Sequence, residues 1–410
     1  MPGAPDHPAL RTSRRGLFGL AAAGGFSTLL PGCSSPERGP AVPINNIGRA
    51  TVLGVKNERF FPLQGGRALE EEFYAALNRS GRVANMQPRQ AAPMLNLIAI
   101  SGGGENGAFG AGLLNGWSQQ GSRPVFDLVT GVSTGALTAP FAFLGSAYDA
   151  KLRAVYTELS PTQVLEKRNL LRAALFDDAM TDNAPLFKTI SRYLDDEMMA
   201  AIAKGYDEGR LLLIGSTDLD AQVPVIWNVG AIAKSGHPKA LDTIRRVLLA
   251  SAAIPGAFPP SLFDVTVDGK PYQELHVDGG AFAQAFLYPA SVTQQRRERL
   301  RQHKSTMPVT AYVIRNGRLD PEWATVERQT MGIAARAIST MIASSGYNDV
   351  MRIYNNTLRD DVAFNLAYIG KDFTKELPEP FDPGFMRALY DYGYQRAVKG
   401  YDWAKQPPAG

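Results

Sequence analysis

The sequence of 410 residues contains one cysteine and four histidines, and this scarcity limits the chemistry open to the chain. A single thiol cannot form a disulfide within the chain, so no disulfide framework stabilises this fold. The few cysteines and histidines also show no spacing typical of metal ligands. We therefore expect neither a metal nor another cofactor, and any reaction must depend on the commoner side chains.

A strong charge of one sign is also missing. The formal net charge is +4, and residues 1–32 contribute +2 of it. Nucleic-acid binding requires a basic surface, so this balance excludes it as the expected function. The basic run at residues 296–304 is interpreted as a solvated helix face, with contact to anionic headgroups as the alternative. With 45% hydrophobic residues, the composition is that of an ordinary globular protein.

The apolar stretch at residues 16–30 is too short to cross a bilayer comfortably, but it suits the core of an export signal. Arg14 and Arg15 precede it, as in twin-arginine signals. It ends at Leu30-Pro31-Gly32-Cys33, which resembles a bacterial lipoprotein cleavage site. We therefore predict export to the cell envelope and a lipid anchor on Cys33 that holds the protein at a bacterial membrane. The alternatives are an uncleaved tail or a soluble exported protein cut nearby.

The most informative motif is a serine between two glycines. Ser133 lies between Gly131 and Gly135, after the apolar residues 125–129 and before the helical pattern of residues 136–144. Glycine at both flanks lets the chain bend sharply between a strand and a helix, so that the hydroxyl projects into open space. The pentapeptide also occurs by chance, but this context favours a nucleophilic serine.

A glycine-rich loop follows the predicted buried strand at residues 97–100. Backbone N–H groups in such a loop can face either a phosphate or the oxyanion formed when an ester carbonyl is attacked. Gly102, Gly104 and Gly107 have the spacing of a dinucleotide-binding loop, and Asp127 follows about twenty residues later. However, Asp127 begins its strand, whereas a ribose-binding acid belongs at the carboxyl end. A dinucleotide-dependent oxidoreductase remains an alternative.

A nucleophilic serine needs a base, and His276 is the only plausible histidine. A carboxylate within hydrogen-bond reach can also take this role directly. Asp278 suits it, because it ends a predicted strand and precedes two glycines that open the turn. The structural interpretation is that Asp278 is simply a turn residue, as in many Asp-Gly pairs.

The three motifs in this order resemble the patatin-like phospholipases, serine acyl hydrolases with a Ser–Asp dyad. The resemblance covers roughly residues 95–283. It implies that Ser133 is the nucleophile and Asp278 the base, and that the amides of three loop glycines form the oxyanion hole: Gly102, Gly103 and Gly104. It also implies a phospholipid or another lipid ester as substrate, cleaved by phospholipase A or lysophospholipase activity. A non-catalytic envelope protein that binds lipid is a further alternative.

One departure from that family is Asn106, where its members often carry Arg or Lys. The sequence therefore offers no cation beside the oxyanion loop.

Strand and helix patterns alternate along the core, which predicts a three-layer α/β/α fold with a mainly parallel central sheet. We divide the chain into an export signal (1–32), a tether (33–46), an N-terminal extension (47–93), a patatin-like catalytic core (94–285) and a C-terminal part of the same domain (286–410). The oligomeric state and the lipid class remain open.

Overall fold

The computed structural model describes residues 38–64, 66–81, 94–158, 181–302 and 306–408, together with positions 162, 164, 166, 167 and 304. The chain divides into two units, Met1–Ser34 and Ser35–Gly410, and every described residue belongs to the second. Cys33 and the predicted export signal therefore lie outside the described residues. Among the helices that the structure does describe, none is long and apolar enough to span a bilayer.

Nine strands of the described residues form one sheet, in the order β1-β7-β6-β3-β2-β10-β11, with β9 paired to β6 and β8 to β9. Strands β11, β10, β2, β3 and β6 are parallel neighbours, and antiparallel pairs extend the sheet beyond β6. The predicted mainly parallel sheet is confirmed. The strands are β1 (Arg59–Phe60), β2 (Leu95–Ile100), β3 (Leu128–Val132), β6 (Leu211–Asp218), β7 (Val223–Asn228), β8 (Ser261–Val267), β9 (Lys270–Asp278), β10 (Val309–Arg315) and β11 (Ala363–Tyr368).

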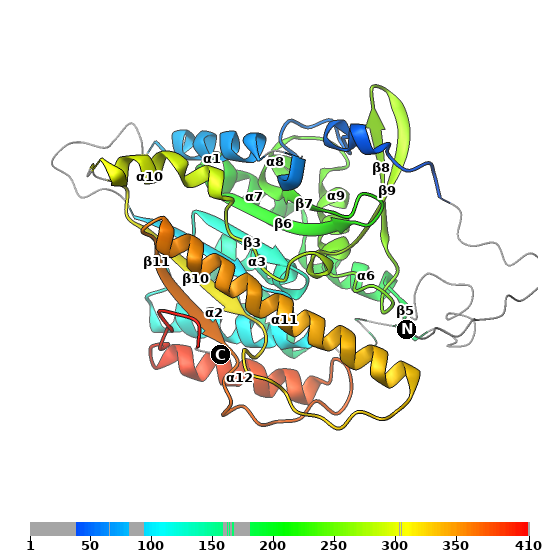
Figure 1. Ribbon diagram of the computed structural model, residues 1–410, viewed down its shortest axis with the longest axis vertical. Coiled ribbons are helices and arrows are strands. Elements are labelled where there is room, and N and C mark those ends of the chain that lie inside the picture. The colour runs from blue at the N-terminus through cyan, green and yellow to red at the C-terminus, as the bar shows by residue number, and fades with distance from the viewer. Residues whose placement is uncertain are drawn as a thin grey trace, which may run out of the picture. The chain divides into compact units, whose positions relative to one another are not determined.

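Helices cover both faces of this sheet (Figure 1), as the three-layer prediction requires. Side chains of β2 alternate between two cores, because successive residues of a strand point to opposite faces. Ile98 and Ile100 pack with α2, α3, α9 and α12, whereas Leu97 and Ala99 pack on the face that α1 and α11 cover. These helices are α1 (Arg67–Arg79), α2 (Gly107–Gln120), α3 (Thr134–Leu144), α9 (Ala240–Ser251), α11 (Thr330–Arg359) and α12 (Pro383–Val398).

Shorter elements complete the described part of the chain. They are the helices α4 (Asp149–Thr157), α6 (Ala184–Tyr193), α7 (Asp196–Asp207), α8 (Val229–Lys234) and α10 (Gln294–Arg301), and the two-stranded sheet of β4 (Glu166–Lys167) and β5 (Thr181–Asp182).

Some expected elements differ from the structure. The pattern of residues 50–55 is compatible with a strand, but no strand forms there, and Thr51 makes only an isolated bridge to Thr266. The pattern after residue 324 predicts a long helix, which begins only at Thr330. Helix α10 is less solvated than expected, because the Arg297 guanidinium lies 3.1 Å from the buried Asp360 carboxylate. Local sequence patterns alone therefore do not determine the structure of these three regions.

Glycines on α2 allow a close approach of α12. A Cβ atom added at Gly112 would lie 2.0 Å from the Tyr390 carbonyl oxygen, and one added at Gly116 would lie 2.3 Å from that of Tyr394. No side chain fits between backbones at this separation.

We expect Gly112→Ala to lower the free energy of unfolding by about 1–3 kcal/mol, because the added methyl forces α2 and α12 apart. Gly332→Ala is the matched control, since a Cβ atom there meets only the Glu327 carbonyl oxygen at 3.5 Å. Alanine at this exposed helical position should be neutral or slightly stabilising. Thermal melts of both variants measure the difference, and equal midpoints would contradict the close-packing argument.

Candidate active site

Ser133 forms the sharp turn between β3 and α3. Its backbone has φ 55° and ψ −128°, a conformation that costs energy for any residue with a side chain. Glycine is required at positions 131 and 135 because backbone atoms lie too close for a side chain there. Neither residue has a positive φ. A Cβ atom at Gly131 would lie 2.5 Å from the Gly135 carbonyl oxygen, and one at Gly135 would lie 2.1 Å from that of Ile100.

Ser251, the last residue of α9, fixes this turn to the neighbouring strand β6. The Ser133 N–H donates to the Ser251 Oγ at 3.0 Å, and the Ser251 hydroxyl donates to the Gly215 carbonyl at 2.6 Å. Ser251 is fully buried. Sequence reasoning missed this role of Ser251 in holding the turn.

Asp278 ends β9 and lies opposite Ser216 of β6. Its backbone N–H donates to the Ala253 carbonyl at 2.9 Å, which fixes the end of the strand. Its carboxylate accepts a hydrogen bond from the Gly280 N–H at 2.7 Å. The Ser133 hydroxyl lies close enough to this carboxylate to lower its pKa. The structure therefore brings together the two residues that the sequence singled out.

Burial raises the pKa of the Asp278 carboxyl to about 7, although the nearby Ser133 hydroxyl and the hydrogen bond from the Gly280 N–H act in the opposite direction. The residue is only 5% exposed, and desolvation disfavours its charged form. A carboxyl group that titrates near neutrality can accept a proton and return it at that pH.

The glycine loop lies beside Ser133. A Cβ atom at Gly102 would come within 3.1 Å of the Ser133 Cβ, and one at Gly103 within 2.0 Å of the Asn316 carbonyl oxygen. The expectation that Gly102 supplies an oxyanion donor is wrong for this structure, because its N–H donates to the Gln284 carbonyl at 3.0 Å. Among the described residues, none accepts a hydrogen bond from the N–H of Gly103 or Gly104, so these two donors remain available.

Arg315, at the end of β10, places a cation behind this loop. Its Nη1 donates to the Gly102 carbonyl at 3.0 Å and to the Ser101 Oγ at 3.2 Å. The side chain is buried, which lowers the pKa of its guanidinium to about 10. The next residue, Asn316, holds the Ser101 carbonyl through its side-chain amide at 2.9 Å. Sequence reasoning missed both residues, and their place after a predicted strand was the only signal.

Asp127 does not support the dinucleotide alternative. It precedes β3, and its carboxylate accepts a hydrogen bond from the Asn96 N–H at 2.8 Å at the amino end of β2. The glycine loop follows the carboxyl end of β2, so this acid lies at the opposite edge of the sheet. No ribose could bridge the two.

His276 contacts other groups than the candidate nucleophile. Its Nδ1 lies 2.9 Å from the Ser216 Oγ, and its Nε2 lies 3.1 Å from the Glu274 carboxylate. The side chain is completely buried. It therefore belongs to a structural network rather than to a Ser–His pair.

One group of possible metal ligands exists among the described residues. Asp218, Glu274 and His276 have ligand atoms within 4.8 Å of one another, and all three are buried. Burial tends to raise the pKa of Glu274, but Arg59 and His276 hold it at about 2. The Arg59 Nη2 lies 3.1 Å from the Glu274 Oε1. A guanidinium already neutralises this carboxylate, so the group forms a buried ion-pair network.

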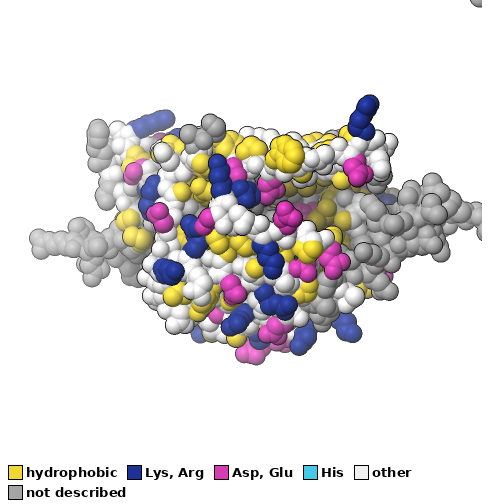
Figure 2. Space-filling view, turned by 90° about the horizontal axis from the view of Figure 1, so that it is seen from below, with side chains coloured by type: hydrophobic (Ala, Val, Ile, Leu, Met, Phe, Trp, Pro, Cys, Tyr) yellow, Lys and Arg dark blue, Asp and Glu magenta, His cyan; other side chains and the backbone are white. Residues whose placement is uncertain are grey.

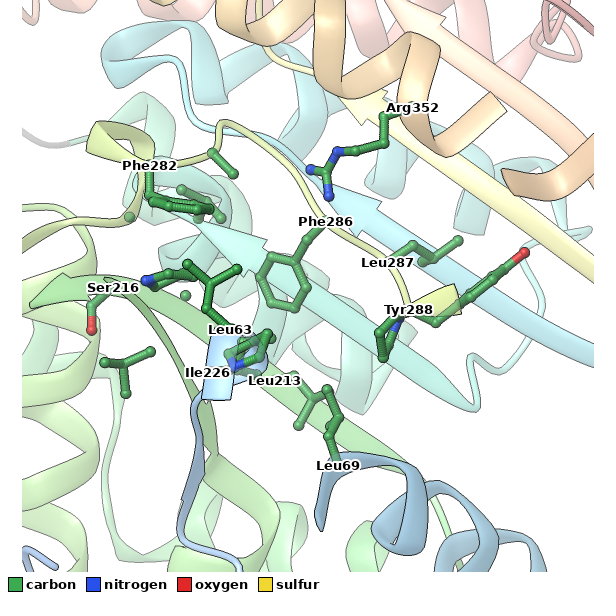
Figure 3. A pocket seen from close by; sticks show the side chains of 18 of the residues that line it. Leu63, Leu69, Leu213, Ser216, Ile226, Phe282, Phe286, Leu287, Tyr288 and Arg352 are labelled. Carbon is green, nitrogen blue, oxygen red and sulfur yellow. The ribbon is translucent and has the colours of Figure 1, made fainter. Parts of the chain in front are cut away.

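Two apolar pockets flank the site. One of about 70 Å³ reaches Gly104 and Thr134 and is otherwise lined mainly by apolar residues of α3, α4, α6 and α9. The other, of about 160 Å³, lies on the opposite face of the sheet and reaches Val132 and Gly279. Figure 3 shows the side chains of Phe286, Ile226 and Leu213 gathered in this second pocket. Each pocket is therefore lined in part by a sequence neighbour of Ser133 or Asp278.

The buried Asp278 carboxylate makes folding depend on pH. Because the pKa of Asp278 is about 7 in the folded state and 3.8 in an ordinary aspartate, the folded state holds this proton more tightly. The resulting stability is fully present below pH 3.8 and is lost as the pH rises through 7. Asp278→Asn removes this titration, so its stability relative to the parent should rise from pH 5 to pH 8 by on the order of 2 kcal/mol.

Urea unfolding of parent and Asp278→Asn at the two pH values measures this gain. The exposed Asp264→Asn variant serves as the control, and we expect no comparable gain from it. A constant difference between Asp278→Asn and parent at both pH values would contradict the raised pKa.

The candidate site lies within a segment that matches the model of a known protein family. Residues 98–290 match the family model described as patatin-like phospholipase. They include Ser133, Asp278 and the three loop glycines. Among solved structures, the crystal structure of VipD from Legionella pneumophila matches at 13% identity and a TM-score of 0.35, over 76% of this chain and 67% of that chain. We carry no property of VipD over, because this similarity is weak. No curated protein sequence matches.

Proposed function

Residues 98–290 form a patatin-like phospholipase domain, a lipid acyl hydrolase, and on this premise we propose that Ser133 is its nucleophile and Asp278 its general base. The observation that supports the proposal most directly is that the buried Ser133 hydroxyl lies close enough to the buried Asp278 carboxylate to affect its pKa. The strained turn at Ser133 adds support, since it is the geometry of a nucleophile elbow.

In the first half-reaction, Asp278 accepts the Ser133 proton while the Ser133 Oγ attacks the ester carbonyl. The tetrahedral oxyanion accepts hydrogen bonds from the Gly103 and Gly104 N–H groups. Collapse breaks the ester bond, and the proton on Asp278 passes to the leaving alcohol oxygen. Water then attacks the acyl-Ser133 ester with Asp278 again as base, which releases the fatty acid and restores the Ser133 hydroxyl.

The electrostatics of the site suit this chemistry. A base with a pKa of about 7 is partly ionised at neutral pH and still takes a proton readily. Each preorganised oxyanion donor is worth about 3–4 kcal/mol of transition-state stabilisation. Arg315, held against the Gly102 carbonyl, supports the loop that carries these donors.

The two apolar pockets support a substrate with acyl chains. A long-chain ester buries apolar surface at about 25 cal/mol per Å² when it leaves water for such a pocket. We propose a phospholipid or a lysophospholipid as the substrate, cleaved at its acyl ester as phospholipases A and lysophospholipases do.

Ser133→Ala should lower the rate of hydrolysis of a soluble short-chain p-nitrophenyl ester by at least about 10³-fold, because the variant has no nucleophile. It should also lose labelling by a fluorophosphonate probe. Ser235→Ala, which changes an exposed serine far along the chain, is the control and should keep both properties. Parental turnover by Ser133→Ala would reject the proposed nucleophile, and a folded parent without labelling would favour the non-catalytic lipid-binding alternative.

We also propose that the leader exports the protein through the twin-arginine route and that Cys33 is then acylated in the cell envelope. The support is the sequence Leu30-Pro31-Gly32-Cys33 after an apolar core. A multiply acylated cysteine would hold the enzyme firmly at a membrane, beside an insoluble substrate.

Parent protein expressed with its leader in a bacterium should incorporate a labelled fatty acid and stay with membranes after an alkaline carbonate wash. Cys33→Ala should do neither, because the acyl acceptor is gone. The wash separates a covalent anchor from reversible surface contact. Equal membrane retention of both forms would refute acylation at Cys33.

A further inference from the structure

Helix α11 has two halves with different surroundings. In its C-terminal half, Val350 and Ile353 are buried in the core beneath the sheet. In its N-terminal half, residues 332–344 are exposed except for Arg336, which is half-buried. This exposed half extends away from the strands in Figure 1. We call residues 330–345 the free half of α11.

The free half carries an apolar face. Ile338, Met341 and Ile342 are 50%, 62% and 37% exposed. Ile338 lies three residues before Met341 and four before Ile342, so these side chains share one side of the helix. Ser339 and Ala343 lie toward the opposite side. In Figure 1, α11 lies on the side of the molecule that faces the viewer. Figure 2 shows the molecule from below, and hydrophobic side chains gather along the upper edge of that view.

The charge of this region is low and of one sign. Arg336 is the only charged residue between positions 330 and 348. Trp323, in the segment that leads into the helix, is 89% exposed. Tryptophan favours the boundary between lipid headgroups and acyl chains.

The free half ends at the wall of the candidate active site. At its end, a Cβ atom on Gly346 would lie 2.6 Å from the Arg315 guanidinium carbon, and Arg315 holds the Gly102 carbonyl. One turn later, the Asp349 carboxylate accepts from the Gln284 N–H at 2.6 Å. Phe282, near this contact, is 44% exposed and lines the larger pocket. A surface that binds the free half therefore lies close to Arg315 and to the glycine loop of the candidate site.

An exposed apolar patch marks an interaction surface. We propose that the apolar face of α11 docks on the surface of a phospholipid bilayer. This inference rests on the proposed function, because the substrate is a bilayer lipid. Lipid fits better than a specific protein surface, since an exposed tryptophan leads into the helix and the helix continues to the wall of a candidate site for lipid esters.

The test uses the full chain with Cys33→Ala, so that no acyl anchor contributes, and vesicles of phosphatidylcholine with phosphatidylglycerol. The face variant carries Ile338→Glu and Ile342→Glu, and the matched control carries Ser339→Glu and Ala343→Glu on the opposite side of the same helix. Both add the same charge to exposed positions. We expect the face variant to lose at least tenfold in vesicle flotation and in hydrolysis of vesicle lipid, whereas the control keeps both.

A soluble p-nitrophenyl ester separates this inference from the proposed function. The face variant should hydrolyse it at the parental rate, because neither substitution touches the site. Flotation of the face variant equal to that of the parent would overturn the docking proposal, whatever the esterase result. A parental dimer in light scattering that the face variant loses, without flotation of either, would overturn it in favour of a second copy. Flotation without any ester turnover would support docking and reject the proposed function alone.

Discussion

The close approach of a buried serine hydroxyl to a buried carboxylate is the constraint on which this site depends. Neither group is stable there alone: Ser133 requires a strained backbone, and Asp278 loses most of its hydration. The carbonyl of Gly215 on β6 is the common support. It accepts the Ser251 hydroxyl that holds the Ser133 turn, and Gly279 packs so closely on it that a Cβ atom would lie 2.4 Å away.

The same arrangement explains why glycine recurs around the site. Gly131, Gly135 and Gly279 are each pressed against backbone atoms of another segment. Their absent side chains let the β3 turn, the glycine loop and the end of β9 approach within hydrogen-bond range. The buried Asp278 lowers the stability of the folded state above neutral pH, because the pKa of its carboxyl is about 7. The site therefore costs some stability.

The proposed chemistry and the proposed membrane contact both involve one helix, α11. The inner half of α11 fixes the loop after Asp278 through Asp349, and its free half presents Ile338 and Ile342 to the surroundings. An enzyme whose substrate stays in a bilayer needs both an apolar site and a way to hold that site at the lipid surface. Helix α11 provides a direct physical connection between the two.

The sequence by itself determined the local elements. Runs such as residues 211–216 predict buried strands, and the glycines around Ser133 indicate the turn. It also singled out Asp278, because a strand end followed by two glycines is a local pattern. Tertiary structure alone decided which loop amides stay free, since Gly102 is engaged by Gln284 from a distant loop. The tertiary structure also places the Arg315 guanidinium against the glycine loop, whereas Asn106 provides no cation there. Contacts between segments far apart in the chain set both features, and no local pattern of residues encodes them.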